Sequence, residues 1–271
     1  MDKRDTFNED ELNYDLYRPD YPKELFSDIK LYSRYSSISR ILEIGIGTGQ
    51  ATLPFLEEGC NVTAVELGDR LSTFVQKKYE NYPNFKVIHS DFMKIDFEEE
   101  SFDLIYCATA YHWLPQPESI NKIARLLKPG GTIALFWNHP FPNRKDDVTN
   151  QINQEVYQKY RPSDKKQLEF SHNDLMRRKS ELFNTSFTDI KAHLYHRMRT
   201  LSSEEYLGLL NTYSDHRLLP KDVKSSFEQE MKQKLDQAGG FIRIYDTLDL
   251  YMATKKPSDN HRYSQSLKST I

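Results

Sequence analysis

The stretch Glu43-Ile-Gly-Ile-Gly-Thr-Gly49 combines an acidic residue with glycine at every second position. An apolar run that ends at Ile44 leads into it, which is typical of a buried strand followed by a loop. Glycine has no Cβ and adopts positive φ, so such a loop lets the backbone come close to a bound molecule. A helix after the loop would direct its free N–H groups and the positive end of its dipole toward that molecule. The stretch therefore predicts a ligand cradle; the alternative is a glycine-rich turn that binds nothing.

The glycine spacing excludes two common kinds of phosphate loop. The dinucleotide fingerprint G-x-G-x-x-G requires its third glycine at position 50, where the chain has Gln50. No Gly-Lys-Ser/Thr follows, so the stretch is not a P-loop. An acid about 20 residues beyond the first glycine can accept hydrogen bonds from both hydroxyls of a ribose. Glu66 stands there, at the end of a predicted strand over 61–66; the alternative is a solvated surface acid.

A second polar pair follows the predicted strand over 85–89. An aspartate at Asp91 can accept from an adenine amino group while Phe92 lies against the ring. The alternative is an Asx turn, in which an aspartate after a strand bonds to its own backbone.

The segment Tyr111-His112-Trp113 follows the next predicted strand, over 102–108. In α/β sheets, ligands bind outside the carboxyl ends of the strands, so these side chains are expected to line the site. His112 is the best catalytic candidate, because a neutral imidazole takes a proton from a hydroxyl or an amine. The alternative is a structural histidine that packs with Trp113 and shapes the pocket.

Bulk composition narrows the class of protein. The 271 residues carry a formal charge of −3, which gives no general attraction to nucleic acid or to an anionic membrane. The N-terminus shows no leader pattern, and no apolar run approaches a membrane span. Cys60 and Cys107 are expected to be buried thiols, and the eight histidines lack metal-site spacing. We expect a cytoplasmic protein, monomeric or homodimeric, with no metal and no membrane or nucleic-acid partner.

Short apolar runs alternate with helical patterns, which predicts βαβ units and a parallel sheet. The expected strands are 40–45, 61–66, 85–89, 102–108 and 131–137, and the expected helices between them are 48–58, 69–80 and 117–127. After these comes a polar stretch with an amphipathic helix whose apolar residues recur four apart from Val148 to Tyr160. Two long β-like segments, 187–200 and 241–254, flank helices over 203–238.

Several motifs resemble those of one family. The acid and three alternate glycines resemble motif I of the class I S-adenosylmethionine-dependent methyltransferases, and Leu126-Leu-Lys-Pro-Gly-Gly131 resembles the turn before their fifth strand. Tyr14-Asp-Leu-Tyr-Arg-Pro-Asp-Tyr-Pro22 and Ala110-Tyr-His-Trp113 resemble segments of the small-molecule subfamily that includes trans-aconitate methyltransferase-like (type 11) enzymes.

The resemblance implies an α/β, Rossmann-like fold with a seven-stranded sheet of order 3-2-1-4-5-7-6, in which strand 7 is antiparallel. The segments 187–200 and 241–254 would be strands 6 and 7. The expected organisation is an entry cap over 1–35, a cofactor-binding core over 36–138, a helical insertion or lid over 139–185 and completion of the sheet over 186–256. The tail over 257–271 is polar and is expected to be disordered.

The same resemblance implies the cofactor S-adenosylmethionine, with S-adenosylhomocysteine as product. The methionine end would lie by the glycine loop, the ribose by Glu66 and the adenine by Asp91. Tyr14 and Arg18 would close over the cofactor. The alternative for these two residues is that they only pack as a cap on the sheet. The residues expected to bind cofactor are Tyr14, Arg18, Glu43, Gly45, Gly47, Thr48, Gly49, Gln50, Glu66, Leu67, Asp91, Phe92, Ala108 and Thr109. The residues expected to line the acceptor pocket are Tyr111, His112 and Trp113.

The implied activity is transfer of a methyl group, by in-line displacement, to an oxygen or nitrogen nucleophile of a small molecule, carboxylates included. The alternatives are a non-catalytic cofactor-binding regulator and a nicotinamide-dependent oxidoreductase, the latter disfavoured by the glycine spacing. Nucleic-acid methylation is disfavoured because Ala108-Thr-Ala-Tyr111 replaces an Asn-Pro-Pro-Tyr motif. The basic run Arg177-Arg-Lys179 is interpreted as a solvated helix face.

Overall fold

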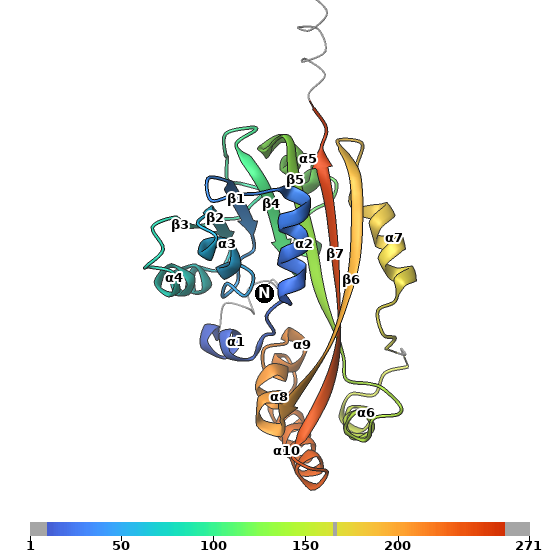
Figure 1. The fold of residues 1–271 in the computed structure, drawn as a ribbon. Helices are drawn as coiled ribbons and strands as arrows, with labels where there is room; N and C mark the ends of the chain where they lie inside the picture. Colours follow the sequence, from blue (N-terminus) through green and yellow to red (C-terminus); the bar gives the residue numbers. More distant parts are fainter. Residues whose placement is uncertain (1–9, 165–166, 258–271) are drawn as a thin grey trace, which may run out of the picture.

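A mixed seven-stranded sheet forms the centre of the computed structural model, which describes residues 10–164 and 167–257 (Figure 1). The strand order is β3-β2-β1-β4-β5-β7-β6. The first five strands are parallel, and β7 runs antiparallel to both β5 and β6. The fold prediction is confirmed. The strands are β1 Arg40–Ile44, β2 Asn61–Glu66, β3 Phe85–His89, β4 Phe102–Ala108, β5 Leu127–Phe141, β6 Phe187–Ser202 and β7 Phe241–Lys255.

Helices cover both faces of the sheet because each presents one apolar side. One face buries side chains such as Ile29 and Phe55 from α2 and α3, and the other buries Ile123 of α5 and Leu175 of α7. These apolar stripes supply most of the driving force for folding. The helices in the core region are α2 Lys23–Ser33, α3 Leu53–Glu57, α4 Asp69–Lys78, α5 Glu118–Leu126 and α7 His172–Leu182.

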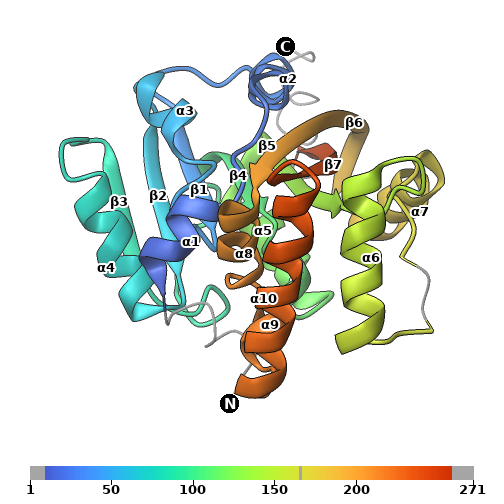
Figure 2. The same ribbon diagram turned by 90° about the horizontal axis from the view of Figure 1, so that it is seen from below.

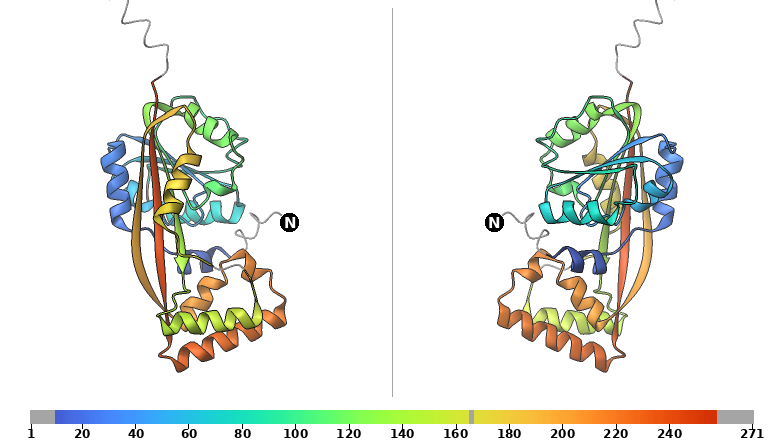
Figure 3. Two further views of the ribbon diagram at one scale, coloured as in Figure 1. Left: turned by 90° about the vertical axis from the view of Figure 1, so that its right-hand side faces the viewer. Right: turned by 90° about the vertical axis from the view of Figure 1, so that its left-hand side faces the viewer.

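Strands β6 and β7 run well beyond the rest of the sheet and carry a separate layer of helices at their lower ends (Figures 1 and 3). This layer has its own apolar cluster, which includes Val156, Phe227 and Ile242. Seen from below, α8 to α10 lie between α1 and α6 (Figure 2). These helices are α1 Glu11–Tyr17, α6 Val148–Tyr160, α8 Ser203–Leu210, α9 Ser214–Arg217 and α10 Lys221–Gln237.

The structure corrects two expected boundaries. The helix expected over 48–58 begins only at Leu53, because Gly49 has a φ of +85°, which a right-handed helix excludes. The strand expected over 131–137 extends to Leu127–Phe141. The extra residues at its carboxyl end, 138–141, pair with the long antiparallel strand β7, a partner that local sequence does not reveal, and Leu127 at the other end pairs with Phe102 of β4.

The basic run 177–179 is also not simply a solvated face. Arg178 points back to the sheet and pairs with Asp249 of β7 at 2.7 Å, whereas Arg177 is exposed. Both cysteines are buried and unbridged, as expected. No helix in the described part of the chain is long and apolar enough to cross a membrane. The tail predicted to be disordered, 257–271, lies outside the described residues except for Pro257.

Candidate functional site

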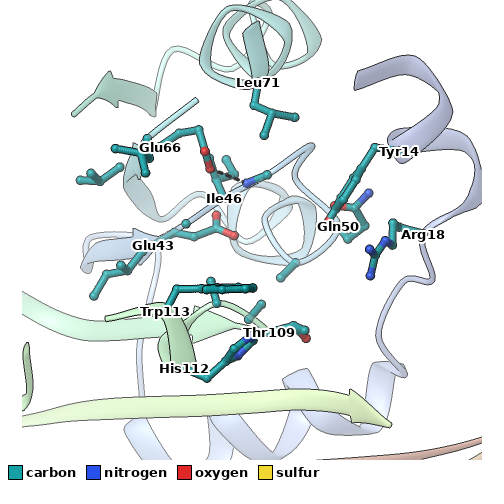
Figure 4. A pocket seen from close by; sticks show the side chains of 18 of the residues that line it. Tyr14, Arg18, Glu43, Ile46, Gln50, Glu66, Leu71, Thr109, His112 and Trp113 are labelled. Carbon is teal, nitrogen blue, oxygen red and sulfur yellow. Dashed lines mark hydrogen bonds between the residues drawn. The ribbon is translucent and has the colours of Figure 1, made fainter. Parts of the chain in front are cut away.

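Four neighbouring strands deliver residues to one cavity of about 330 Å³. Ile44 of β1, Glu66 of β2, Ala108 of β4 and Asn138 of β5 all line it, and Figure 4 shows the side chains that converge there. The cavity lies at the carboxyl ends of parallel strands, which is where α/β proteins bind their ligands. Its volume falls in the range of small-molecule sites.

The glycine loop leaves β1 in a conformation that few other residues adopt. Gly45 has a φ of +72°, and a Cβ built there would lie 2.8 Å from Cβ of Ala110. The loop after β4 therefore approaches the glycine loop only because position 45 has no side chain. The Gly45 N–H donates to the carbonyl of Val65 at 2.8 Å, which ties the loop to β2.

Glu66 holds the glycine loop from the next strand. One carboxylate oxygen accepts from the Gly47 N–H and the other from the Gly68 N–H, both at 2.9 Å. The side chain is buried, and this burial raises its pKa while the backbone hydrogen bonds act in the opposite direction. Each carboxylate oxygen has a further lone pair, so Glu66 can accept additional hydrogen bonds from a molecule in the cavity.

Glu43 is the second buried acid of the cavity. One of its oxygens accepts from the hydroxyls of Thr52 and Tyr106, each at 2.7 Å. Burial raises its pKa to about 8, while the two hydrogen bonds lower it. The carboxyl group is therefore protonated at neutral pH until a cation reaches the cavity and favours its ionised form.

This raised pKa predicts an unusual dependence of stability on pH. Between pH 4.5 and about 8, Glu43 is ionised in the unfolded chain but protonated in the folded one. Its contribution to the free energy of unfolding therefore falls as pH rises through this range. Glu43→Gln stays neutral and removes that contribution. Urea unfolding of both proteins at about pH 5 and about pH 8 measures the difference in slope; equal slopes would contradict the assignment.

Asp91 and Phe92 follow β3 and both line the cavity. Oδ1 of Asp91 accepts from the Met93 N–H at 2.9 Å, so the Asx turn considered as an alternative is present. The same residue still faces the cavity through its remaining acceptors. The Phe92 ring is nearly buried, with the Lys122 ammonium 5.1 Å from its centroid.

Arg18 closes the opposite side of the cavity (Figure 4). Its guanidinium lies between two aromatic rings, 4.8 Å from the centroid of Tyr14 and 4.5 Å from that of Tyr213. One terminal nitrogen donates to the carbonyl of Thr212 at 2.9 Å. Its Nε, although buried, has no hydrogen-bond partner. Oδ1 of Asn138 is buried without a partner in the same cavity.

His112 and Trp113 lie in a single helical turn after β4, with ring centroids 5.0 Å apart. Both line the cavity. Nδ1 of His112 accepts from the indole N–H of Trp137 at 3.1 Å. Partial burial lowers the pKa of His112, and the nearby Arg178 and His139 lower it further.

The structure brings most of the predicted residues to this cavity. Thr48 and Gly49 lie in the loop but do not line the cavity, and Gly49 packs against Tyr79. Tyr111 is buried in the core with its hydroxyl bonded to Gln116, so its expected place in the acceptor pocket is not found. The predicted residues that do line the cavity are Tyr14, Arg18, Glu43, Gly45, Gly47, Gln50, Glu66, Leu67, Asp91, Phe92, Ala108, Thr109, His112 and Trp113.

Sequence reasoning missed several lining residues, among them Tyr21, Asn138 and Tyr213. The rule that sites lie at strand ends would have found Asn138, which follows the predicted strand over 131–137. Tyr213 lies before α9 and carries no motif that points to the site. Within residues 10–164 and 167–257, no three His, Cys, Asp or Glu side chains gather to hold a metal ion.

Comparisons with known proteins agree with this arrangement. Residues 42–135 match the family model of a methyltransferase domain. An uncharacterized methyltransferase of Schizosaccharomyces pombe is 28% identical over 232 residues, which cover 84% of this chain and 86% of the relative.

Two solved structures share the fold at low sequence identity. A protein of Anaeromyxobacter dehalogenans, provisionally described as a type II methyltransferase, is 18% identical with a TM-score of 0.63 over 89% of this chain and all of that one. A phosphoethanolamine N-methyltransferase of Haemonchus contortus, solved with S-adenosylhomocysteine, is 15% identical with a TM-score of 0.54 over 95% of this chain and 61% of that one.

These findings agree on one class of domain. Residues 42–135 are similar to a methyltransferase domain, and the sheet has the strand order that the resemblance implies.

Proposed function

We propose that the cavity binds S-adenosylmethionine and that the protein transfers its methyl group to a small-molecule acceptor. The observation that carries the proposal is the position of Glu66, a buried acid at the end of β2 that faces the same cavity as the glycine loop of β1. Acids at this position accept hydrogen bonds from ribose hydroxyls.

Other polar groups of the cavity suit the remaining parts of this cofactor. Nε of Arg18 is a buried donor without a partner and suits the carboxylate of the methionine end. Glu43 offers a carboxylate to its ammonium group, and Asp91 with Phe92 suits the adenine. Gln50, Leu67, Ala108 and Thr109 line the walls between them.

S-adenosylmethionine supplies a methyl group that its sulfonium already activates, so the protein needs to add little covalent chemistry. Tyr14 and Arg18 cover the cavity and exclude water, and the glycine loop fixes the depth at which a ligand lies. His112 and Trp113 border the space that remains for an acceptor. Proximity, alignment and exclusion of water are the contributions expected of these residues.

A second, larger cavity of about 1890 Å³ supplies a route for the acceptor. It lies between α6 and the α8–α9 region, and it shares Pro140 and Tyr213 with the first cavity. We infer that the insertion carrying α6 forms a lid whose walls select an acceptor with an oxygen or nitrogen nucleophile.

Parallel calorimetric titrations with S-adenosylmethionine, S-adenosylhomocysteine and NADH test the proposed cofactor. We expect one binding site for each adenosyl compound and none for NADH. Binding of NADH alone would favour the oxidoreductase alternative. Tight binding of S-adenosylmethionine without methyl transfer to a broad panel of acceptors would favour a regulatory protein.

His112→Ala separates catalysis from cofactor binding. Because His112 borders the acceptor space, we expect the variant to lower turnover about tenfold or more, the value of one lost hydrogen bond in the transition state. The affinity for S-adenosylmethionine should stay nearly unchanged. Calorimetry and transfer of a labelled methyl group measure the two effects; a large loss of cofactor affinity without a separate effect on rate would contradict the assignment.

A further inference from the structure

The contact between Trp137 and His112 decides which nitrogen of His112 carries a proton. The indole nitrogen of Trp137 lies 3.1 Å from Nδ1 of His112. An indole N–H donates and never accepts, so Nδ1 must present its lone pair. A neutral imidazole with an accepting Nδ1 carries its proton on Nε2. Among the residues that the structure describes, none hydrogen-bonds to Nε2 of His112.

The indole itself is held rigidly. Trp137 lies in β5, is 5% exposed, and packs edge-on against Tyr111 and Tyr251 with centroids 6.4 and 6.0 Å away. The guanidinium of Arg178, from α7, lies 4.6 Å from the ring centroid. Arg178 is anchored in turn on the fully buried Asp249 at 2.7 Å. The direction of the indole N–H is therefore set by the core.

The charged groups around His112 also favour its neutral form. Arg178 from α7 and His139 from β5 both lower its pKa, in addition to burial. The carboxylate of Asp249, from β7, is engaged by Arg178, His139 and the hydroxyl of Tyr251. A protonated His112 would turn an N–H of Nδ1 against the indole N–H, which removes the hydrogen bond and sets two donors against each other.

We propose that Trp137 is a positioning residue that holds His112 as its Nε2–H tautomer, so that His112 donates a hydrogen bond to the methyl acceptor and does not remove a proton from it. The reference to an acceptor rests on the proposed function; the tautomer does not.

The class of acceptor follows from this arrangement. His112 and Trp113 border the space left for an acceptor, and Asn138 and Tyr213 line the same cavity; none of the four is a carboxylate. With the accepting nitrogen of His112 already occupied, these residues offer hydrogen-bond donors but no base. They suit an acceptor whose nucleophilic atom is ionised before it binds. The lone pair of that anion forms the new bond to the methyl carbon, the carbon–sulfur pair stays on sulfur, and no proton has to leave.

Nuclear magnetic resonance of the full chain, labelled with ¹⁵N-histidine and free of ligand, tests the proposal. Multiple-bond ¹H–¹⁵N correlations distinguish the two neutral tautomers, and the loss of signals in His112→Gln assigns the residue. In the wild type we expect a protonated Nε2 and a bare Nδ1 on His112 at neutral pH. A proton on Nδ1 would overturn the proposal, and this measurement needs no variant of Trp137.

Trp137→Phe is the matching variant, because phenylalanine keeps an aromatic ring in the core but has no N–H. We expect His112 to titrate at a higher pH than in the wild type and to show a fraction of the other tautomer. His216, whose ring bonds to Tyr157, is the internal control and should not change. An unchanged titration and tautomer of His112 would contradict the role of Trp137. Neither result depends on cofactor or acceptor, so calorimetry tests the proposed function separately.

Discussion

Glu66→Ala is expected to weaken the binding of S-adenosylmethionine about 100-fold or more. A hydrogen bond to a charged group contributes about 1.5–3 kcal/mol, and loss of two such bonds to ribose hydroxyls accounts for at least this factor. The substitution also frees the N–H groups of Gly47 and Gly68, which Glu66 now holds at 2.9 Å. The glycine loop then keeps only its backbone bond from Gly45 to Val65 of β2, and the weaker attachment adds to the loss of affinity. Calorimetric titration of both proteins with S-adenosylmethionine measures the change in affinity.

Two controls make this result specific. Glu80→Ala removes an exposed glutamate just beyond α4 and should leave affinity unchanged. Glu66→Gln keeps the shape and one acceptor, so its affinity should fall between those of the wild type and the alanine variant. Wild-type affinity in Glu66→Ala, with the fold intact by circular dichroism, would remove Glu66 from the site.

Gly49→Ala is expected to lower the free energy of unfolding by about 2–5 kcal/mol. The left-handed conformation costs an L-residue about 1–2 kcal/mol, and Gly49 has a φ of +85°. A Cβ there would also lie 2.7 Å from the ring of Tyr79, which is buried and bonds through its hydroxyl to the carbonyl of Gly49. Forcing a methyl group into a packed core costs about 1–3 kcal/mol more.

Gly130→Ala is the matched control for this prediction. Gly130 has nearly the same φ, +78°, but a Cβ there meets nothing within 4 Å. Gly130→Ala should therefore lower the free energy of unfolding only by the cost of the left-handed conformation, about 1–2 kcal/mol. Urea unfolding of the two variants measures the difference. Equal losses would mean that the ring of Tyr79 yields to the added methyl group.

The sequence was sufficient for the central sheet because its signals are local. The strands 61–66, 85–89 and 102–108 were predicted with their observed ends, since each is a short apolar run bounded by polar or turn residues. Glu43 and Glu66 could be placed at the site because strand ends meet at one edge of a parallel sheet. Their roles toward cofactor stay predictions.

What the sequence missed depends on contacts between distant segments. Tyr213 lies against Arg18 although 195 residues separate them, and no pattern in either segment indicates the contact. Arg178 belongs to a basic run of the kind that normally faces solvent, but its guanidinium forms an ion pair with the buried Asp249 of β7. The helix expected over 48–58 begins late, at Leu53, because the glycines of the loop, Gly49 included, adopt positive φ values that a right-handed helix excludes.

The crystal structure of this protein with S-adenosylhomocysteine tests the central claim most directly. We predict that the ribose hydroxyls bond to Glu66, that the adenine lies by Asp91 and Phe92, and that the amino-acid carboxylate meets Nε of Arg18. The sulfur should then face the space bordered by His112 and Trp113. A ligand bound elsewhere, or one in this cavity whose ribose does not touch Glu66, would contradict the account.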